Sequence, residues 1–214
     1  CDGTLVDSQY VIIDSMQAAF QKHGLPPPAA ESVKSIVGLS LHEAIGRLHG
    51  EGDAPVIDDL VIAYKEVFFD LRASKDLHEP LFDSTRETLS ELTAAGYLLG
   101  VATGKSRRGL LATLESHDLA KHFVTLQTAD DAPGKPHPGM LEQAMAETGA
   151  DKGETVLIGD TVFDIEMALN AGVGAFGVSW GYHAADQLHA AGAHSVLDHL
   201  SELAPLLAQP KKVN

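Results

Sequence analysis

A single cysteine occurs among the 214 residues, so the chain cannot form an internal disulfide bond. Small secreted domains commonly depend on such bonds, and this class is therefore disfavoured. No apolar run approaches the roughly 18 residues that a membrane-spanning helix needs, and no signal peptide is recognisable. We therefore expect a cytoplasmic protein that does not bind a membrane.

Basic residues are scarce: Lys and Arg number 15 against 30 Asp and Glu, which gives a formal charge of −15. Such a charge repels polyanions and argues against nucleic acid as a partner. A small anionic substrate would have to be held by local cations and backbone amides. The length is sufficient for one domain, or for a core with an inserted module, and we expect a monomer or a homodimer.

The first 80 residues lack a convincing strand pattern. Apolar residues recur there at helical spacing, and Pro26-Pro27-Pro28 breaks the chain after the first such stretch. The predicted helices span about residues 10–20, 30–37, 41–48 and 56–72. We interpret this part of the sequence as a helical module.

From Asp83 onward, strand and helix patterns alternate. Strands are predicted at residues 97–102, 122–127, 155–158, 175–179 and 194–197, and helices at 84–95, 106–117, 138–148, 162–170 and 200–207. This alternation predicts an α/β fold with a doubly wound parallel sheet of Rossmann-like type. We assign residues 1–11 and 81–214 to this core and residues 12–80 to an inserted α-helical cap. In such sheets the active site lies at the carboxyl ends of the strands.

Four polar segments fall at predicted strand ends. They are Asp2-Gly3-Thr4, Thr103-Gly104-Lys105, Lys135-Pro136, and the stretch 159–164. Asp160 ends an apolar strand, and Asp164 follows four residues later on the same helix face. Mg²⁺ usually takes one or two carboxylates together with waters and a substrate phosphate, so this pair predicts a magnesium site.

Two of the segments supply positive charge. Thr103 and Lys105 lie at a strand-to-helix turn, where free amides and the helix dipole attract a phosphate. Lys135 adds a mobile point charge for the same oxygens. Taken singly, each segment also fits an ordinary turn, an exposed lysine or a helix cap. The ordered set of four at strand ends is what favours a shared site.

This ordered set resembles the haloacid dehalogenase superfamily, and within it the branch similar to phosphoglycolate phosphatases. The first motif of that family is Asp-x-Asp-Gly-Thr, and the segment 1–8 matches everything after its first residue. The segments 101–105, 135–138 and 159–164 resemble the second, third and fourth motifs. The resemblance covers almost the whole chain, including a helical cap inserted after the first motif.

The resemblance implies a Mg²⁺-dependent phosphatase that hydrolyses a small phosphorylated metabolite, such as phosphoglycolate, through a phosphoaspartate intermediate. Asp2 would be the general acid and base, and its backbone carbonyl would bind Mg²⁺. Asp160 would also ligate Mg²⁺. Asp164 would hold the waters of the metal or act as a further ligand.

The same resemblance assigns phosphate binding to a second group of residues. Lys135 would offset charge between phosphate and nucleophile, and Thr103 with nearby amides would hold the transferring phosphoryl group. The full phosphate-binding set would be Gly3, Thr103, Gly104, Lys105 and Lys135.

The attacking carboxylate implied by the first motif would stand directly before Cys1. The sequence opens at Cys1 with neither an initiator Met nor a preceding strand, and we interpret it as a fragment or a truncated numbering. Two aspartates separated by one residue project to the same side of an extended segment, as a nucleophile and its acid require. We therefore expect an aspartate immediately upstream.

Other activities on similar sheets stay open. A sugar-phosphate mutase uses the same core, although such enzymes tend to carry basic residues beside the cap segment 37–41, whose flanks are apolar here. A phosphoacceptor signalling domain shares the acidic cluster, Thr and Lys but lacks the helical insertion. A non-catalytic phosphate-binding relative is a third alternative. In the cap, Lys34, Ser40 and Arg47 are candidate substrate contacts.

Overall fold

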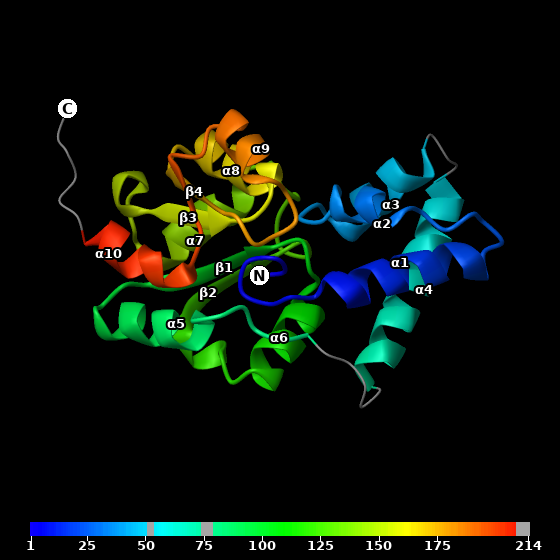
Figure 1. The fold of residues 1–214 in the computed structure, drawn as a ribbon, viewed down its shortest axis with the longest axis horizontal. Helices are drawn as coiled ribbons and strands as arrows, with labels where there is room; N and C mark the ends of the chain where they lie inside the picture. The colour runs from blue at the N-terminus through cyan, green and yellow to red at the C-terminus, as the bar shows by residue number, and fades with distance from the viewer. Residues whose placement is uncertain (51–53, 74–78, 209–214) are drawn as a thin grey trace.

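The computed structural model describes residues 1–50, 54–73 and 79–208, and its second part alternates strands with helices (Figure 1). The strands are β1 (Leu99–Thr103), β2 (Phe123–Thr128), β3 (Val156–Gly159), β4 (Gly174–Val178) and β5 (Ser195–Leu197). The helices are α5 (Thr85–Ala94), α6 (Arg107–Ser116), α7 (Gly139–Thr148), α8 (Val162–Ala171), α9 (Ala185–Ala190) and α10 (Leu203–Leu207). Short 3₁₀ turns lie at Ala120–His122, Lys152–Glu154 and Leu200–Glu202. The predicted α/β fold is confirmed.

The named strands pair in parallel, β1 with β2, and β3, β4 and β5 in that order. Val156 lies opposite Gly174, and Phe176 lies opposite Ser195. Parallel strands end on the same side of a sheet, and the segments that follow β1, β2 and β3 line one cavity together with residues of the helical part. Loop residues placed there can therefore act together, although they are far apart in sequence.

Residues 1–6 form a tight loop at this side of the sheets. The amides of Thr4, Leu5 and Val6 donate to the carbonyl oxygen of Cys1 over 3.3, 2.8 and 3.1 Å. Gly3 adopts a φ of 73°, a left-handed conformation that glycine accepts without strain. The loop thus turns Asp2 toward the strand ends while the chain continues into the first helix.

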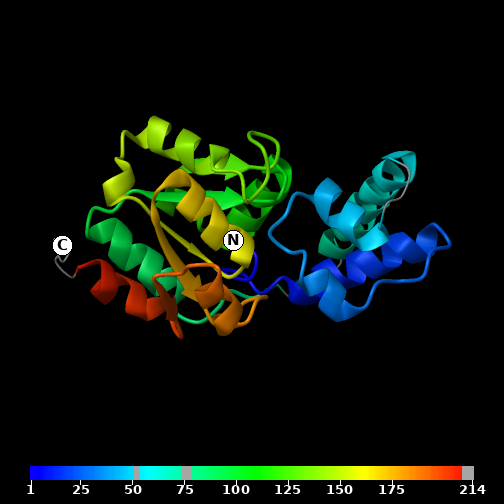
Figure 2. The same ribbon diagram turned by 90° about the horizontal axis from the view of Figure 1, so that it is seen from above.

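Helices α1 (Gln9–Lys22), α2 (Ala30–Lys34), α3 (Leu41–His49) and α4 (Ala54–Ala73) lie together at one end of the α/β part (Figures 1 and 2). They enclose a hydrophobic cluster that includes Met16, Phe20, Ile45 and Leu60. Among the described residues, no helix has both the length and the apolar character required to cross a bilayer.

The chain passes between the two parts at two neighbouring points. The amide of Asp7 donates to the carbonyl oxygen of Pro80 over 2.8 Å, and Val6 bridges Leu81. Helix α1 begins at Gln9, so the predicted boundary at residue 12 falls inside this helix. The division into a core of 1–11 and 81–214 and a cap of 12–80 stays a prediction.

Two local expectations differ from the structure. β1 begins at Leu99, because the amide of Tyr97 still bonds to the carbonyl oxygen of Leu92 and completes the end of α5 after Gly96. Tyr97 and Leu98 are 39% and 60% exposed, so this apolar pair does not belong to a buried strand. Helix α9 was not predicted, because its six residues carry too short a pattern.

Leu110 and Leu111 allow a matched test of the α/β packing. Leu110 is fully buried against Val101 and Leu114, whereas Leu111 is 39% exposed. Leu110→Ala should lower the free energy of unfolding by about 2–5 kcal/mol, because it leaves a cavity in this cluster. Leu111→Ala should change it by about 0.5 kcal/mol or less. Urea denaturation measures both, and equal losses would contradict the packing described.

Candidate active site

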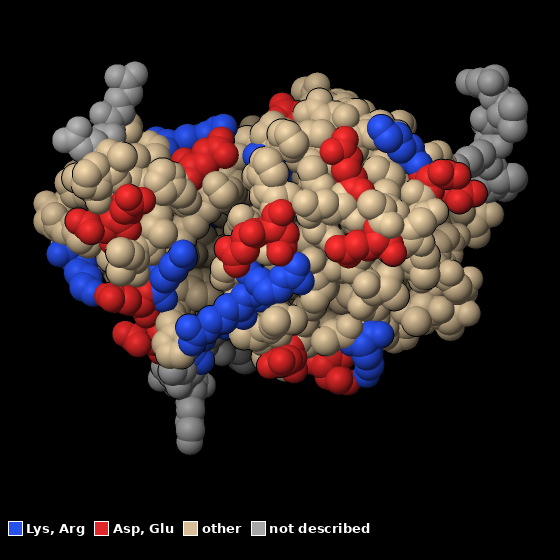
Figure 3. Space-filling model, turned by 180° about the vertical axis from the view of Figure 1, so that it is seen from behind, with Lys and Arg blue, Asp and Glu red and all other residues tan. Residues whose placement is uncertain are grey.

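A cavity of about 1070 Å³ lies between helices α1–α4 and the strand ends. Figure 3 shows the surface hollowed between the helical part and the α/β part. The lining includes Asp2, Thr103, Gly104, Lys105, Lys135, Asp160 and Asp164. Gly3 lies beside them, because a side chain at this position would overlap the carboxylate of Asp160. The structure therefore brings together every residue predicted to take part in catalysis, phosphate binding or metal binding.

Asp160 follows β3 directly and is only 2% exposed. Its Oδ1 accepts a hydrogen bond from the Thr4 hydroxyl over 2.7 Å, and its Oδ2 accepts one from the Tyr182 amide over 3.0 Å. Gly3 and Gly181 both pack so closely that a Cβ atom at either position would overlap Asp160. The first loop and the loop after β4 thus hold this carboxylate in a fixed orientation.

The charge of Asp160 is poorly compensated. Burial, and next the negative charge of Asp164, raise the pKa of its carboxyl to about 6. Within the described ranges no Lys, Arg or His side chain forms an ion pair with it. A bound cation would relieve this unfavourable buried charge.

Asp164 has the opposite environment. Its Oδ1 accepts from the Lys135 ammonium over 2.5 Å, and both side chains are 5% exposed. Its Oδ2 accepts from the Thr161 hydroxyl and amide, which forms a capping box at the start of α8. Burial would raise the pKa of Asp164, but Lys135 and Thr161 hold it below its usual value. This carboxylate is ionised, and both of its oxygens already accept hydrogen bonds.

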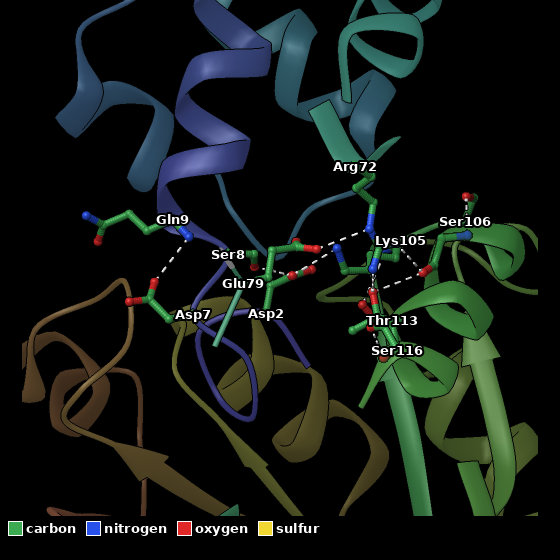
Figure 4. Close-up of polar contacts among 12 residues, drawn as sticks. Asp2, Asp7, Ser8, Gln9, Arg72, Glu79, Lys105, Ser106, Thr113 and Ser116 are labelled. Atoms are coloured by element: carbon green, nitrogen blue, oxygen red, sulfur yellow. Dashed lines mark hydrogen bonds and ion pairs between the residues drawn. The ribbon is translucent and has the colours of Figure 1, made fainter. Parts of the chain in front are cut away.

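Asp2 is held by residues from both sides of the cavity (Figure 4). Its Oδ1 lies 2.9 Å from the Lys105 ammonium and also accepts a hydrogen bond from the Ser8 hydroxyl. Burial would raise the pKa of Asp2, but the Lys105 charge contributes most among the influences that lower it. Lys105 therefore serves as the direct partner of Asp2, a pairing that spacing in the sequence did not reveal.

The turn after β1 carries Thr103, Gly104 and Lys105. Thr103 is 3% exposed, and its hydroxyl accepts from the Lys105 amide over 3.2 Å. The Ser106 hydroxyl caps α6 by accepting from the Gly109 amide over 3.2 Å. A Cβ atom on Gly104 would overlap the carbonyl oxygen of Leu39, so this glycine permits close contact with the helical part.

The donor set fits a cation bound mainly by oxygen. Among the described residues, no three acidic, histidine or cysteine side chains lie close enough to form a complete metal site. Mg²⁺ tolerates such a site, because it retains waters and uses substrate phosphate as a ligand. The undercompensated carboxylate of Asp160 is the observation that favours a cation here.

Several contacts around the site were not predicted. Thr4 and Tyr182 bond to Asp160, and Ser8 bonds to Asp2. The segment 180–183 lies just beyond the carboxyl end of β4 at Val178. Active sites of parallel sheets lie at the carboxyl ends of the strands, so inspection of every predicted strand end would have indicated this segment. The role of Ser8 depends on the folded shape of the first loop, and no local pattern reveals it.

The three cap candidates have different surroundings. Ser40 lines the main cavity. Lys34 pairs with Glu31 over 2.9 Å and lines a separate cavity of about 290 Å³. Arg47 pairs with Glu43 over 2.8 Å and lies over the ring of Phe163. Only Ser40 is placed to meet a ligand in the main cavity.

The sequence model of the haloacid dehalogenase-like hydrolases matches residues 1–178. This chain belongs to that family. The resemblance to this family, which the ordered set of strand-end residues indicated, is therefore confirmed.

Relatives of this haloacid dehalogenase-like hydrolase include named phosphatases. The probable phosphatase IndB of Dickeya dadantii is 36% identical over 207 residues, which cover 94% of this chain and 88% of the relative. A phosphoglycolate phosphatase of Vibrio parahaemolyticus is 32% identical over 213 residues, covering 97% and 93%. The crystal structure of a hydrolase from Pseudomonas syringae shares the fold, with a TM-score of 0.86 at 23% identity and coverage of 96% and 94%.

Gly104 gives a test of the contact between the two parts of this haloacid dehalogenase-like hydrolase. In Gly104→Ala the new methyl group would meet the backbone of Leu39, which cannot move as a side chain could. We expect the free energy of unfolding to fall by about 1–3 kcal/mol. Gly153→Ala is the matched control, because a Cβ atom there meets nothing within 4 Å. Thermal unfolding compares the variants, and equal melting temperatures for both would refute the contact.

Proposed function

We propose that this protein is a Mg²⁺-dependent phosphatase that hydrolyses small phosphate monoesters through a phosphoaspartate intermediate. The observation that carries the proposal is the meeting of buried carboxylates and lysines in one cavity of a strongly acidic protein. Lysines so placed can bind an anionic substrate that the overall charge repels. The named phosphatases among the relatives support the same reaction.

We place the nucleophile in an aspartate that directly precedes Cys1. Cys1 lines the same cavity as Asp2, Lys135, Asp160 and Asp164. A residue directly before Cys1 would therefore lie close to the charged side chains of the site, which supports the assignment. Reading the codon before that of Cys1 tests it, and any residue other than Asp removes this nucleophile.

Asp2 acts first as an acid and then as a base. In the first step the nucleophile forms a bond to phosphorus, the ester P–O bond breaks, and the leaving alkoxide takes the proton of Asp2. In the second step Asp2 takes a proton from water, whose oxygen attacks the phosphoaspartate and releases phosphate. A positioned group of this kind contributes about 10²–10⁴-fold.

The pairing of Asp2 with Lys105 is compatible with this role. In the absence of substrate, Lys105 keeps Asp2 ionised. A bound phosphate dianion competes for the same ammonium and places negative charge near Asp2, and both effects favour protonation. Substrate binding would therefore prepare the acid that the first step needs.

Thr103, Gly104, Lys105 and Lys135 would bind the oxygens of the transferring phosphoryl group. Phosphoryl transfer depends mainly on position and on compensation of charge, and both lysines supply such compensation. The first turn after β1 adds amides to the same oxygens. Gly3 leaves room beside Asp160 for this arrangement.

Asp160 and the backbone carbonyl of Asp2 would hold Mg²⁺. When bound, the metal supplies a positive charge that stabilises the phosphate oxygens in the transition state. Asp164 is already bonded to Lys135 and Thr161, which favours a role in holding metal-bound water over direct ligation. It would also keep Lys135 in place.

Release of inorganic phosphate by full-length protein tests the function as a whole. Phosphoglycolate, named in one relative, is the first substrate to assay, with and without Mg²⁺ and with EDTA. Turnover that requires Mg²⁺ supports the proposal. Stable phosphorylation without turnover would support a phosphoacceptor instead, and phosphate transfer within a sugar would support a mutase.

The variant Asp160→Asn distinguishes an effect on metal binding from an effect on folding, because activity and stability are measured separately. The amide keeps the shape of the side chain but removes the charge, so Mg²⁺-dependent kcat/KM should fall by about 100-fold or more. Stability in EDTA at pH 7.5 should equal or exceed that of the parent, because a buried charge is removed. Asp151→Asn, at an exposed position, is the control. Near-parental activity in Asp160→Asn would eliminate the metal assignment.

The pKa of Asp160 predicts how metal binding depends on pH. Above pH 6 the carboxyl is ionised and available to Mg²⁺, and below pH 6 a proton competes for it. The increase in Tm caused by Mg²⁺ should therefore be large at pH 7.5 and small at pH 5. Measurements in EDTA at each pH subtract the effects of other groups. An increase that is the same at both pH values would contradict the involvement of Asp160.

A further inference from the structure

We infer that the substrate is a phosphate monoester whose leaving group carries an aromatic ring; this inference rests on the proposed phosphatase function. It concerns the part of the main cavity that extends from Lys105 between the helical part and the α/β part. There the walls are α4 of the helical part and α6 of the α/β part.

The cavity is much larger than a phosphoryl group and a two-carbon alcohol require. Its volume of about 1070 Å³ slightly exceeds the roughly 300–1,000 Å³ typical of pockets for drug-sized ligands. The uncharged part of the lining is largely apolar and includes Met16, Ile36, Val61 and Ala112, whereas α4 and α6 also contribute charged residues such as Glu66 and Arg108. A large leaving group with an apolar surface fits the uncharged part.

Aromatic side chains of α4 form one wall. Tyr64 and Phe68 stack with their ring centroids 5.7 Å apart and an interplanar angle of 22°. Phe69, the next residue, is 56% exposed although it lines the cavity. An exposed ring beside a cavity, as that of Phe69 is, offers a stacking surface to a flat ligand.

This aromatic wall is next to the predicted acid. The Lys105 ammonium that pairs with Asp2 also lies 5.0 Å from the centre of the Phe68 ring. Tyr64 and Asp2 also line the same cavity. An alcohol oxygen that receives the proton of Asp2 would therefore place its carbon skeleton against these rings.

A guanidinium group extends the wall toward solvent. The Cζ of Arg108, on α6, lies 4.7 Å from the centre of the Phe69 ring, and this side chain has no ion pair within the part of the chain that is described. Arg72 is different: it is bonded to Glu79 and Thr113 and holds α4 against α6 (Figure 4). A planar guanidinium that already stacks on a ring can stack on a second, ligand-borne ring.

Three alkyl phosphates test the inference on full-length protein with Mg²⁺. They are 2-phenylethyl phosphate, 2-cyclohexylethyl phosphate of similar size, and phosphoglycolate, all with alkoxide leaving groups. We expect kcat/KM for the phenyl compound to be about tenfold or more higher than kcat/KM for phosphoglycolate. It should also be about threefold higher than kcat/KM for the cyclohexyl compound. Equal values for phenyl and cyclohexyl, or a preference for phosphoglycolate, would overturn the inference. No phosphate release from any compound would instead refute the proposed phosphatase function.

Variants of α4 locate the preference. Phe69→Ala should lower the ratio of kcat/KM for the phenyl compound to that for phosphoglycolate by about fivefold, and Phe69→Leu should lower it to a similar degree because it restores apolar area but no ring. Ile62→Ala is the matched control, since Ile62 is also 56% exposed, lies two turns earlier on α4 and does not line the cavity. A parental ratio in Phe69→Ala, or an equal fall in Ile62→Ala, would contradict the role of the ring.

Discussion

Two ion pairs, one with the buried Lys135 and one with the largely buried Lys105, allow this protein to gather three carboxylates beside the ends of its strands. Lys135 compensates Asp164, and Lys105 compensates Asp2, each through a contact below 3 Å. Burying unpaired charges is strongly unfavourable, so without these lysines the acidic cluster would oppose folding. Asp160 is the carboxylate that has no lysine partner among the described residues. Its pKa is raised because its negative charge is buried and lies near Asp164. The same arrangement that permits folding thus leaves one position suited to a cation.

The helical part contributes to the site through direct contact with the loops of the α/β part. Leu39 meets Gly104, and Phe68 covers the ammonium of Lys105. Lys105 therefore pairs with Asp2 on one side and packs against the Phe68 ring of the helical part on the other. Any movement of α4 would change the surroundings of Asp2 through this single side chain.

The sequence predicted the alternation of strands and helices, because each element carries its own apolar period. It also predicted that Asp2, Thr103, Lys135 and Asp160 meet, because parallel strands end on one side. It did not predict the pairing of Lys105 with Asp2 or the bond from Tyr182 to Asp160, since both depend on how distant loops pack. Tyr97 was assigned to a strand because it begins an apolar run. In the structure its amide instead bonds to the carbonyl oxygen of Leu92 at the end of α5.

The hydrogen bond between Asp7 and Pro80 joins the outgoing and returning chain within one contact. A segment whose two ends lie so close together can change in length without altering the path of the chain on either side. Mutations that lengthen or shorten helices α1–α4 can therefore leave the loops at the strand ends in place.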